Sequence, residues 1–171
     1  MSEKKQPSAR IPGVTFRESV RPEDAETVRA LVEATGYFTA VEIPVAVELV
    51  QENLSKGAAA SGYHFLFAEQ AGRMIGYACY GPIPCTVSSH NLYWIVVHPA
   101  FQGRGLGKTL MREAEKRIGE MGGTRIYIDT SYKAQYEDTR AFYESLGYSL
   151  GCLLPDFYAP GDDKVIYAKV L

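Results

Sequence analysis

The stretch "HPAFQGRGLGKTLM" (residues 98–111) has glycine at three alternate positions, Gly103, Gly105 and Gly107. It follows an apolar run that ends in "VVHP" and precedes a helical pattern that starts at Gly107. Glycine allows left-handed backbone conformations and lets a ligand approach the chain closely. Because the N–H groups at the start of a helix also attract anions, the stretch predicts a strand, a loop and a helix that together bind a phosphate group.

Two common nucleotide-binding motifs do not fit this stretch. Where a P-loop requires its first glycine, the chain has Gln102. The dinucleotide motif Gly-x-Gly-x-x-Gly fails as well, because counting from Gly103 or Gly105 places Lys108 or Leu110 at the last glycine position. The phosphate is therefore expected to belong to a different kind of cofactor.

The apolar pattern on both sides of the stretch predicts alternating strands and helices. The run "NLYWIVV" is too apolar to have a solvent-facing side, so we expect its strand in the middle of a sheet. The predicted order implies one α/β domain in which helices pack on a mixed sheet. Strands are expected over 13–18, 64–69, 74–81, 91–98, 124–130, 148–154 and 164–171, and helices over 21–36, 43–57, 107–121 and 137–147.

Length and composition limit the class of protein. A chain of 171 residues that is 46% hydrophobic can bury one core, so we expect a single domain over 13–171 behind a disordered polar tail over 1–12. A net charge of -2 argues against a nucleic-acid partner. The polar start and the shortness of the longest apolar run predict a cytoplasmic protein with no membrane segment. Three cysteines, an odd number, predict free and buried thiols.

Gln102, Gly105 and Gly107 fit the pattern Gln-x-x-Gly-x-Gly between an apolar strand and an amphipathic helix. This pattern, its setting and the later segment "AFYESLGY" (141–148) resemble the GNAT superfamily of N-acetyltransferases, over nearly the whole chain from residue 13. The resemblance implies the acyl-CoA N-acyltransferase fold: an α/β protein with a mixed, mostly antiparallel sheet, splayed central strands and helices on both faces. It also implies acetyl-CoA as cosubstrate, with no metal ion.

The same resemblance implies where acetyl-CoA would lie. The glycine loop would hold the pyrophosphate through backbone N–H groups, and a bulge in the preceding strand would present an N–H group to the thioester carbonyl. For the cationic side chains of the loop, direct phosphate contact and simple solvation both remain open. The expected cofactor-binding residues are Ile95, Val96, Val97, Gln102, Gly103, Arg104, Gly105, Leu106, Gly107 and Lys108.

Tyr143 and Asp129 are the expected catalytic residues. Tyr143 occupies the position of the family's tyrosine, which gives a proton to the departing coenzyme sulfur; as an alternative, it is a core aromatic one turn from Leu146. Many relatives carry a glutamate on the fourth strand as general base, but "NLYWIVV" has no carboxylate. Asp129, at the end of the next strand, is therefore the candidate base, acting directly or through water, with a solvated strand-end carboxylate as the alternative.

The acceptor is expected to bind beside a long loop over 153–167, which carries Asp156, Asp162 and Asp163 together with Phe157 and Tyr158. In relatives, this region and the first two helices line the acceptor pocket, although "APGDD" is also ordinary turn sequence. The predicted function is transfer of an acetyl group from acetyl-CoA to a primary amine of a small molecule or a protein, by direct attack in a ternary complex. The alternative is a non-catalytic acyl-CoA-binding sensor. The resemblance also makes a homodimer possible.

Overall fold

The computed structural model describes residues 11–171, so most of the expected disordered tail lies outside the described residues. Pro12, the last residue of that expected tail, is instead attached to the fold, because its carbonyl oxygen accepts a hydrogen bond of 2.8 Å from the Gln70 side chain. No helix within residues 11–171 is long and apolar enough to cross a membrane.

Seven strands form a mixed sheet in the order β1-β2-β3-β4-β5-β7-β6. The β4–β5 pair is parallel, and it joins residues 89–92 to residues 125–128. The predicted α/β class with a mostly antiparallel sheet is confirmed. The elements are β1 (Val14–Arg17), α1 (Asp24–Thr35), α2 (Glu42–Ser61), β2 (His64–Gln70), β3 (Arg73–Pro82), β4 (Ser89–Val97), α3 (Leu106–Glu120), β5 (Arg125–Ser131), α4 (Glu137–Glu144), β6 (Ser149–Ala159) and β7 (Asp162–Val170), with short 3-10 turns η1 (Pro99–Phe101) and η2 (Ala134–Tyr136).

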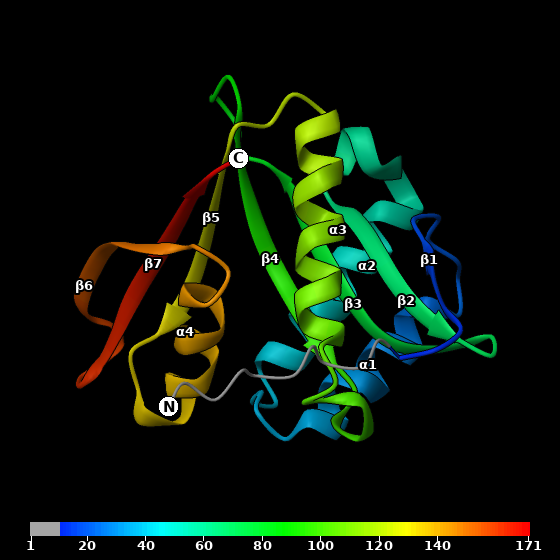
Figure 1. The fold of residues 1–171 in the computed structure, drawn as a ribbon, viewed down its shortest axis with the longest axis horizontal. Helices are drawn as coiled ribbons and strands as arrows, with labels where there is room; N and C mark the ends of the chain where they lie inside the picture. Colours follow the sequence, from blue (N-terminus) through cyan, green and yellow to red (C-terminus); the bar gives the residue numbers. More distant parts are fainter. Residues whose placement is uncertain (1–10) are drawn as a thin grey trace, which may run out of the picture. The chain divides into compact units, whose positions relative to one another are not determined.

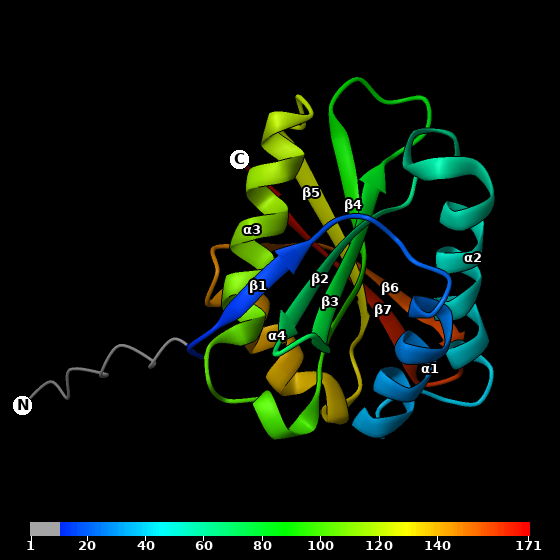
Figure 2. The same cartoon turned by 90° about the vertical axis from the view of Figure 1, so that its right-hand side faces the viewer.

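The chain divides into two compact units, and β3, β4 and α3 each contribute residues to both. The first unit contains the chain up to Ala78 together with Trp94–Arg112, and the second contains Cys79–Tyr93 and Glu113–Leu171. In the first unit, α1 and α2 lie on one side of strands β1 to β3, and the start of α3 lies on the other (Figure 2). Its core contains the stacked rings of Phe65, Phe67 and Tyr77.

Helix α2 extends further than the sequence pattern predicts. Gly57, the expected end, has a non-helical backbone (φ 77°, ψ 162°), but the helix resumes beyond this kink and ends at Gly62. Leu54 was expected on the buried face and is exposed. Its neighbour Asn53 turns inward instead and donates a hydrogen bond of 2.7 Å to the Tyr63 carbonyl oxygen. The buried face therefore ends one turn earlier, at Val50.

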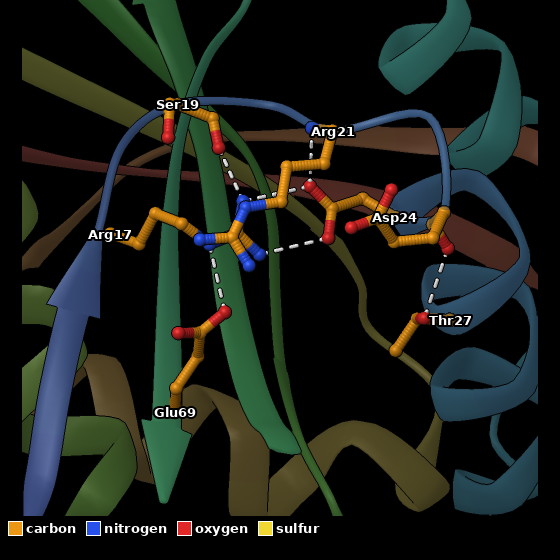
Figure 3. Close-up of polar contacts among 7 residues, drawn as sticks. Arg17, Ser19, Arg21, Asp24, Thr27 and Glu69 are labelled. Atoms are coloured by element: carbon orange, nitrogen blue, oxygen red, sulfur yellow. Dashed lines mark hydrogen bonds and ion pairs between the residues drawn. The ribbon is translucent and has the colours of Figure 1, made fainter. Parts of the chain in front are cut away.

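A buried ion cluster fixes the start of α1 against the sheet in the first unit. Arg17 of β1 donates two hydrogen bonds of 2.8 Å to the Asp24 carboxylate and one of 2.8 Å to Glu69 of β2 (Figure 3). Asp24 also accepts a hydrogen bond of 2.7 Å from the Arg21 N–H group, and its side chain is 3% exposed. Burial opposes the charge of Arg17, but its hydrogen bonds to the Asp24 and Glu69 carboxylates, with their negative charge, outweigh this effect and raise the pKa of the guanidinium.

In the second unit, the end of α3 and the whole of α4 pack on strands β5 and β7 (Figure 1). Ile118 of α3 is fully buried, and Lys169 of β7 forms an ion pair of 2.9 Å with Glu115 of α3. Met121 was expected on the same buried face but is exposed, because α3 ends at Glu120 and Gly122 (φ 84°) turns the chain away.

The expected long loop over 153–167 is wrong. Strand β6 continues to Ala159, and β7 begins at Asp162 after a turn of two residues, so this segment is a tight hairpin. Proline and aspartate suggested a loop, but β6 lies at the edge of the sheet, where Pro155 is tolerated.

Side chains, in place of regular strand pairing, hold the middle of this hairpin. The register of β6 with β7 shifts between Leu154 and Ala159, and Asp156 has a left-handed backbone (φ 53°). The Asp156 carboxylate accepts a hydrogen bond of 2.6 Å from the Gly161 N–H group, and the Asp156 N–H group donates one of 2.8 Å to Asp163. Asp162 accepts a hydrogen bond of 2.6 Å from the Ser131 hydroxyl and forms an ion pair of 2.8 Å with Lys133. All three aspartates of the predicted acceptor region therefore have structural partners.

The prediction of buried thiols holds for one cysteine. Cys79 of β3 is fully buried, and burial raises the pKa of its thiol well above the ordinary value. Cys85 and Cys152 are exposed, and all three cysteines are free. Cys152 lies on the edge strand β6, which explains its exposure.

Candidate active site

Two backbone hydrogen bonds join the segments of β3 and β4 at opposite ends. Between these two bonds, the β4 segment has one residue more than the β3 segment. At one end, the Ile83 N–H group donates to the Ser89 carbonyl oxygen (2.9 Å), and at the other the His98 N–H group donates to the Ile75 carbonyl oxygen (2.9 Å). An extra residue in one of two paired strands is a β-bulge, which leaves a backbone group outside the regular pairing.

Gly76 of β3 locates this irregularity near the end of β4. A methyl group at Gly76 would lie 2.8 Å from the Val96 carbonyl oxygen and 3.5 Å from Val97 Cα, so a single β3 residue lies beside two residues of β4. The same methyl group would approach Leu110 of α3 to 3.2 Å. Gly76 therefore allows β3 to pack closely against both the irregular end of β4 and α3.

Replacing Gly76 with alanine is expected to lower the free energy of unfolding by about 1 to 3 kcal/mol, because backbone atoms of β4 would have to move. The matched control is Gly119→Ala in α3, where a methyl group would meet nothing within 4 Å. The control should gain up to about 1 kcal/mol from better helix propensity. Urea unfolding measures both changes, and a Gly76→Ala protein as stable as the parent would contradict the close contact.

The glycine loop joins β4 to α3 in the left-handed conformations that its sequence predicts. Gly103 has φ 70° and Gly105 has φ 81°. The Gln102 side chain donates a hydrogen bond of 3.0 Å to the Val97 carbonyl oxygen and so ties the loop to the end of β4. Thr109 donates a backbone hydrogen bond of 3.0 Å to Gly105. The N–H groups of 106–108 therefore form the first turn of α3, where backbone donors lack partners within the helix.

The side chains of the loop divide into buried and exposed groups. Leu106 is buried and anchors the first turn of α3 in the core. Arg104 and Lys108 are exposed, and the Arg104 guanidinium lies 5.9 Å from the centre of the Phe101 ring. The loop therefore combines backbone donors with two accessible positive charges, which is an arrangement that suits an anion.

Tyr143 lies in α4 of the second unit, within a cluster of tyrosines. Its ring centre is 6.1 Å from that of Tyr148 and 6.0 Å from that of Tyr167. Burial raises the pKa of the Tyr143 hydroxyl above its ordinary value, so the group stays protonated at neutral pH. It can therefore donate a proton or a hydrogen bond, and the same packing also suits the core role that the sequence left open.

The tyrosine cluster should make the protein unstable at alkaline pH. Burial raises the pKa of Tyr148, assisted by the charge of Glu115, and burial with a hydrogen bond to Glu144 raises the pKa of Tyr167 to about 12. In the unfolded chain these hydroxyls lose their protons near pH 10, whereas the folded protein keeps them to higher pH. The free energy of unfolding therefore has its full value below pH 10, and above pH 10 it decreases by about 1.4 kcal/mol per pH unit for each tyrosine. Urea unfolding between pH 8 and 11.5 should show this decrease, and Tyr148→Phe should reduce its slope. A pH-independent stability would contradict the effect.

Asp129 of β5 does not have a free carboxylate. The Lys164 ammonium group forms an ion pair with it, and Lys164 also lies 4.6 Å from the centre of the Phe157 ring. The register of β5 with β7 explains the contact, because Asp129 pairs with Ile166 and Lys164 lies two residues from Ile166, on the same face of the sheet. An ammonium group on the carboxylate competes with the proton that a general base must accept.

Comparison with known proteins identifies the family. The model of the acetyltransferase (GNAT) family matches residues 29–148, which include β4, the glycine loop, α3 and Tyr143. The chain belongs to the GNAT family.

Individual relatives agree with this assignment. The crystal structure of a GNAT-family protein from Desulfovibrio desulfuricans shares 48% identity with this GNAT chain, covers 92% of it and 98% of its own length, and superposes with a TM-score of 0.90. The uncharacterized N-acetyltransferase YjgM of Escherichia coli K12 is 31% identical over 100 residues, which are 53% of this chain and 57% of YjgM. The chain thus matches about half the length of this curated relative.

A more distant structure shares the fold. An aminoglycoside 6'-N-acetyltransferase, solved in complex with coenzyme A, superposes with a TM-score of 0.72 at 20% identity, covering 91% of this chain and 96% of its own. At this identity the likeness extends to the GNAT fold and no further.

Sequence reasoning missed an aromatic pair beside the expected cofactor residues of the GNAT chain. Trp94 of β4 directly precedes Ile95, and its ring centre lies 4.8 Å from that of Phe38, at an interplanar angle of 49°. Phe38 lies between α1 and α2, and no local pattern links it to a strand residue so distant in sequence.

The structure distributes the predicted site residues of this GNAT protein between the two units. Ile95, Val96, Val97 and the whole glycine loop belong to the first unit, and Tyr143 and Asp129 belong to the second. Within residues 11–171, no group of three or more His, Cys, Asp or Glu side chains is placed to hold a metal ion.

Proposed function

We propose that this GNAT protein transfers the acetyl group of acetyl-CoA to a primary amine by direct attack in a ternary complex. The observation that carries the proposal is the glycine loop at the start of α3, where left-handed Gly103 and Gly105 lead into a helix of 15 residues. The family assignment is independent support, because the family model covers this loop.

The pyrophosphate of acetyl-CoA would bind to the backbone N–H groups between Gln102 and Lys108. These groups lie at the positive end of the α3 dipole, and glycine side chains leave the approach open. Arg104 and Lys108 are exposed beside the loop and would add charge-assisted contacts to the phosphate oxygens. Leu106 contributes through its backbone only, since its side chain is buried.

The thioester would lie against the irregular end of β4. An extra strand residue near Val96 and Val97 frees a backbone N–H group from regular pairing, and such a group can donate to the thioester carbonyl oxygen. As the amine attacks, this oxygen becomes negatively charged, so the donor would stabilise the transition state more than the bound substrate.

In the chemical step, the amine nitrogen would attack the acetyl carbon, and the bond from that carbon to sulfur would break. The Tyr143 hydroxyl would donate a hydrogen bond to the departing sulfur, and any proton that it gives to the sulfur would be regained from solvent, while the amine would lose a proton to water or to Asp129. An alkyl amine has a pKa near 10.4, so its free base at pH 7 costs about 4 to 5 kcal/mol. The ion pair between Asp129 and Lys164 favours water as the first proton acceptor.

One observation supports the second candidate, an acyl-CoA-binding sensor without catalysis. Strand β4 has no carboxylate, and the carboxylate of Asp129 is paired with Lys164. A sensor would keep the glycine loop and would not need a general base. Both candidates therefore predict acetyl-CoA binding, and only the transferase predicts release of free coenzyme A with an amine.

Ligand-induced thermal stabilisation tests the cofactor assignment. Acetyl-CoA at 100 times its Kd should raise the Tm by about 5 to 10 °C, and ATP and NAD should have much smaller effects. Gly105→Ala should abolish most of the acetyl-CoA shift, because a side chain strains the left-handed loop backbone.

Gly62→Ala is the matched control for the loop variant. Gly62 (φ 74°) caps the end of α2 in a similar left-handed conformation, and a methyl group there would meet nothing within 4 Å, so its replacement strains only a backbone far from the loop in sequence. This control should lose stability but keep the acetyl-CoA shift. Equal shifts from acetyl-CoA, ATP and NAD would contradict the assignment.

A further inference from the structure

Exposed apolar side chains lie close in the sequence to Phe38 of the Phe38–Trp94 pair in the first unit. Tyr37, between α1 and α2, is exposed, as are Val41, which is 79% exposed, and Val45, one helical turn further along. These five residues, Tyr37, Phe38, Val41, Val45 and Trp94, are called the aromatic surface below. Large apolar side chains that gather on a surface mark a binding site more often than isolated ones do.

The aromatic surface is adjacent in the chain to the proposed thioester site. Trp94 is followed directly by Ile95, and the irregular end of β4 begins two residues after Trp94. Phe38 contacts Trp94 through its ring at 4.8 Å, so the segment between α1 and α2 reaches the same part of β4. A group bound on these rings would therefore lie near the carbon that an acceptor amine must attack.

The charge of the same segment suits a positively charged group. Between Arg29 and Lys56 the sequence has four glutamates and no lysine or arginine. Glu52 forms an ion pair with Lys56, whereas Glu42 accepts hydrogen bonds of 2.8 and 2.9 Å from the neutral Thr39 and keeps its charge. The remaining negative charge attracts an ammonium group and repels a carboxylate.

We propose that the acceptor is a primary amine that carries an aromatic or branched apolar group and no carboxylate, and that this group binds on the aromatic surface. The inference rests on the proposed function. If the thioester lies beside β4, the amine end of the acceptor must point toward β4, and the other end can bind on the aromatic surface. A free amine and the amino-terminal residue of a peptide share this chemistry.

Intrinsic fluorescence tests this binding without requiring catalysis. Trp94 is the sole tryptophan of the sequence, so its emission reports directly on the aromatic surface. With the protein saturated by coenzyme A, 2-phenylethylamine should change the emission in a saturable way. Its Kd should be about 10- to 100-fold lower than that of ethylamine, from burial of the phenyl ring. Spermidine, which carries no aromatic or branched apolar group, should bind more weakly than 2-phenylethylamine, and phenylalanine should bind more weakly than phenylalanine amide.

Two variants test whether the tighter binding of 2-phenylethylamine depends on the aromatic surface. Phe38→Ala, with its fold checked by the Tm, should raise the Kd for 2-phenylethylamine at least about 10-fold and leave that for ethylamine nearly unchanged. Phe157→Ala is the control, since Phe157 is a 53% exposed aromatic on β6 in the hairpin that the sequence first suggested for the acceptor. This control should leave both Kd values unchanged.

The outcomes separate this inference from the proposed function. Spermidine binding more tightly than 2-phenylethylamine, no saturable emission change, or an effect of Phe157→Ala equal to that of Phe38→Ala would overturn the inference. Apolar amine binding without any release of coenzyme A from acetyl-CoA would keep the binding site and contradict the transferase. If phenylalanine amide and a peptide beginning with phenylalanine are compared in the transfer assay, faster transfer to one of them identifies the source of the amine.

Discussion

The Tyr143→Phe protein is expected to turn over about 10- to 1000-fold more slowly than the parent, with an unchanged Kd for acetyl-CoA. The phenylalanine ring preserves the packing against Tyr148 and Tyr167 and removes only the hydroxyl. A thiol has a pKa near 8.5, so its anion can leave without a full proton transfer. Because burial raises the pKa of Tyr143, complete transfer to sulfur is uphill, and a hydrogen bond to the developing thiolate is the main contribution that we expect.

Tyr148→Phe is the matched control for this variant. Tyr148 is also a buried tyrosine with a raised pKa in the same cluster, but it is not the residue that matches the family's tyrosine. Its replacement should change kcat less than about threefold, whereas a general acid contributes at least about 100-fold in many enzymes. An equal loss of kcat in the two variants would show that the packing of the tyrosine cluster, and not the Tyr143 hydroxyl alone, determines the rate. An unchanged kcat in Tyr143→Phe would remove Tyr143 from the mechanism.

Asp24→Asn should lower the free energy of unfolding by about 3 to 5 kcal/mol, the largest stability effect that we expect from a single substitution here. The Arg17 guanidinium would keep its buried position but lose the carboxylate that accepts two of its hydrogen bonds (Figure 3). Glu69 would remain as one charged partner, and the Arg21 N–H group would lose a charged acceptor.

Glu26→Gln in the same helix is the control for this ion cluster. Glu26 forms an ion pair of 3.6 Å with Arg29, but its side chain is 82% exposed, so its loss should cost less than about 1 kcal/mol. Urea unfolding of both variants at pH 7 measures the difference. Equal stability of Asp24→Asn and Glu26→Gln would show that the buried cluster contributes no more than a surface pair.

Much of the fold could be predicted because its signals are local. The apolar segments on both sides of "QAGR" (70–73) predict the β2–β3 hairpin, and the turn residues Ala71 and Gly72 have the positive φ values that such turns need. The β6–β7 hairpin was missed because a proline and an aspartate within β6 are also typical of loops, and only the edge position of the strand makes them acceptable. At Gly57 the sequence predicts the end of a helix, but the structure has a kink, because a kink and an end have the same local sequence signal.

The candidate site shows the same division between local and distant contacts. The glycine loop could be predicted because its donors and glycines are consecutive in the chain. The ion pair of Asp129 with Lys164 depends on the register of two strands, and the Phe38–Trp94 contact depends on how the α1–α2 segment packs on β4. Neither relation has a period or a spacing that single-sequence reasoning can detect.

Release of free coenzyme A from acetyl-CoA tests the central claim most directly. The assay compares 2-phenylethylamine, phenylalanine amide, spermidine, an aminoglycoside and a peptide with a free amino terminus, each against the rate in water alone. The account predicts release above that background with at least one amine, fastest with the apolar amines, and a loss of that rate in Tyr143→Phe. If acetyl-CoA binds but no amine accelerates release, the transferase proposal is contradicted and the chain is better described as an acyl-CoA-binding sensor.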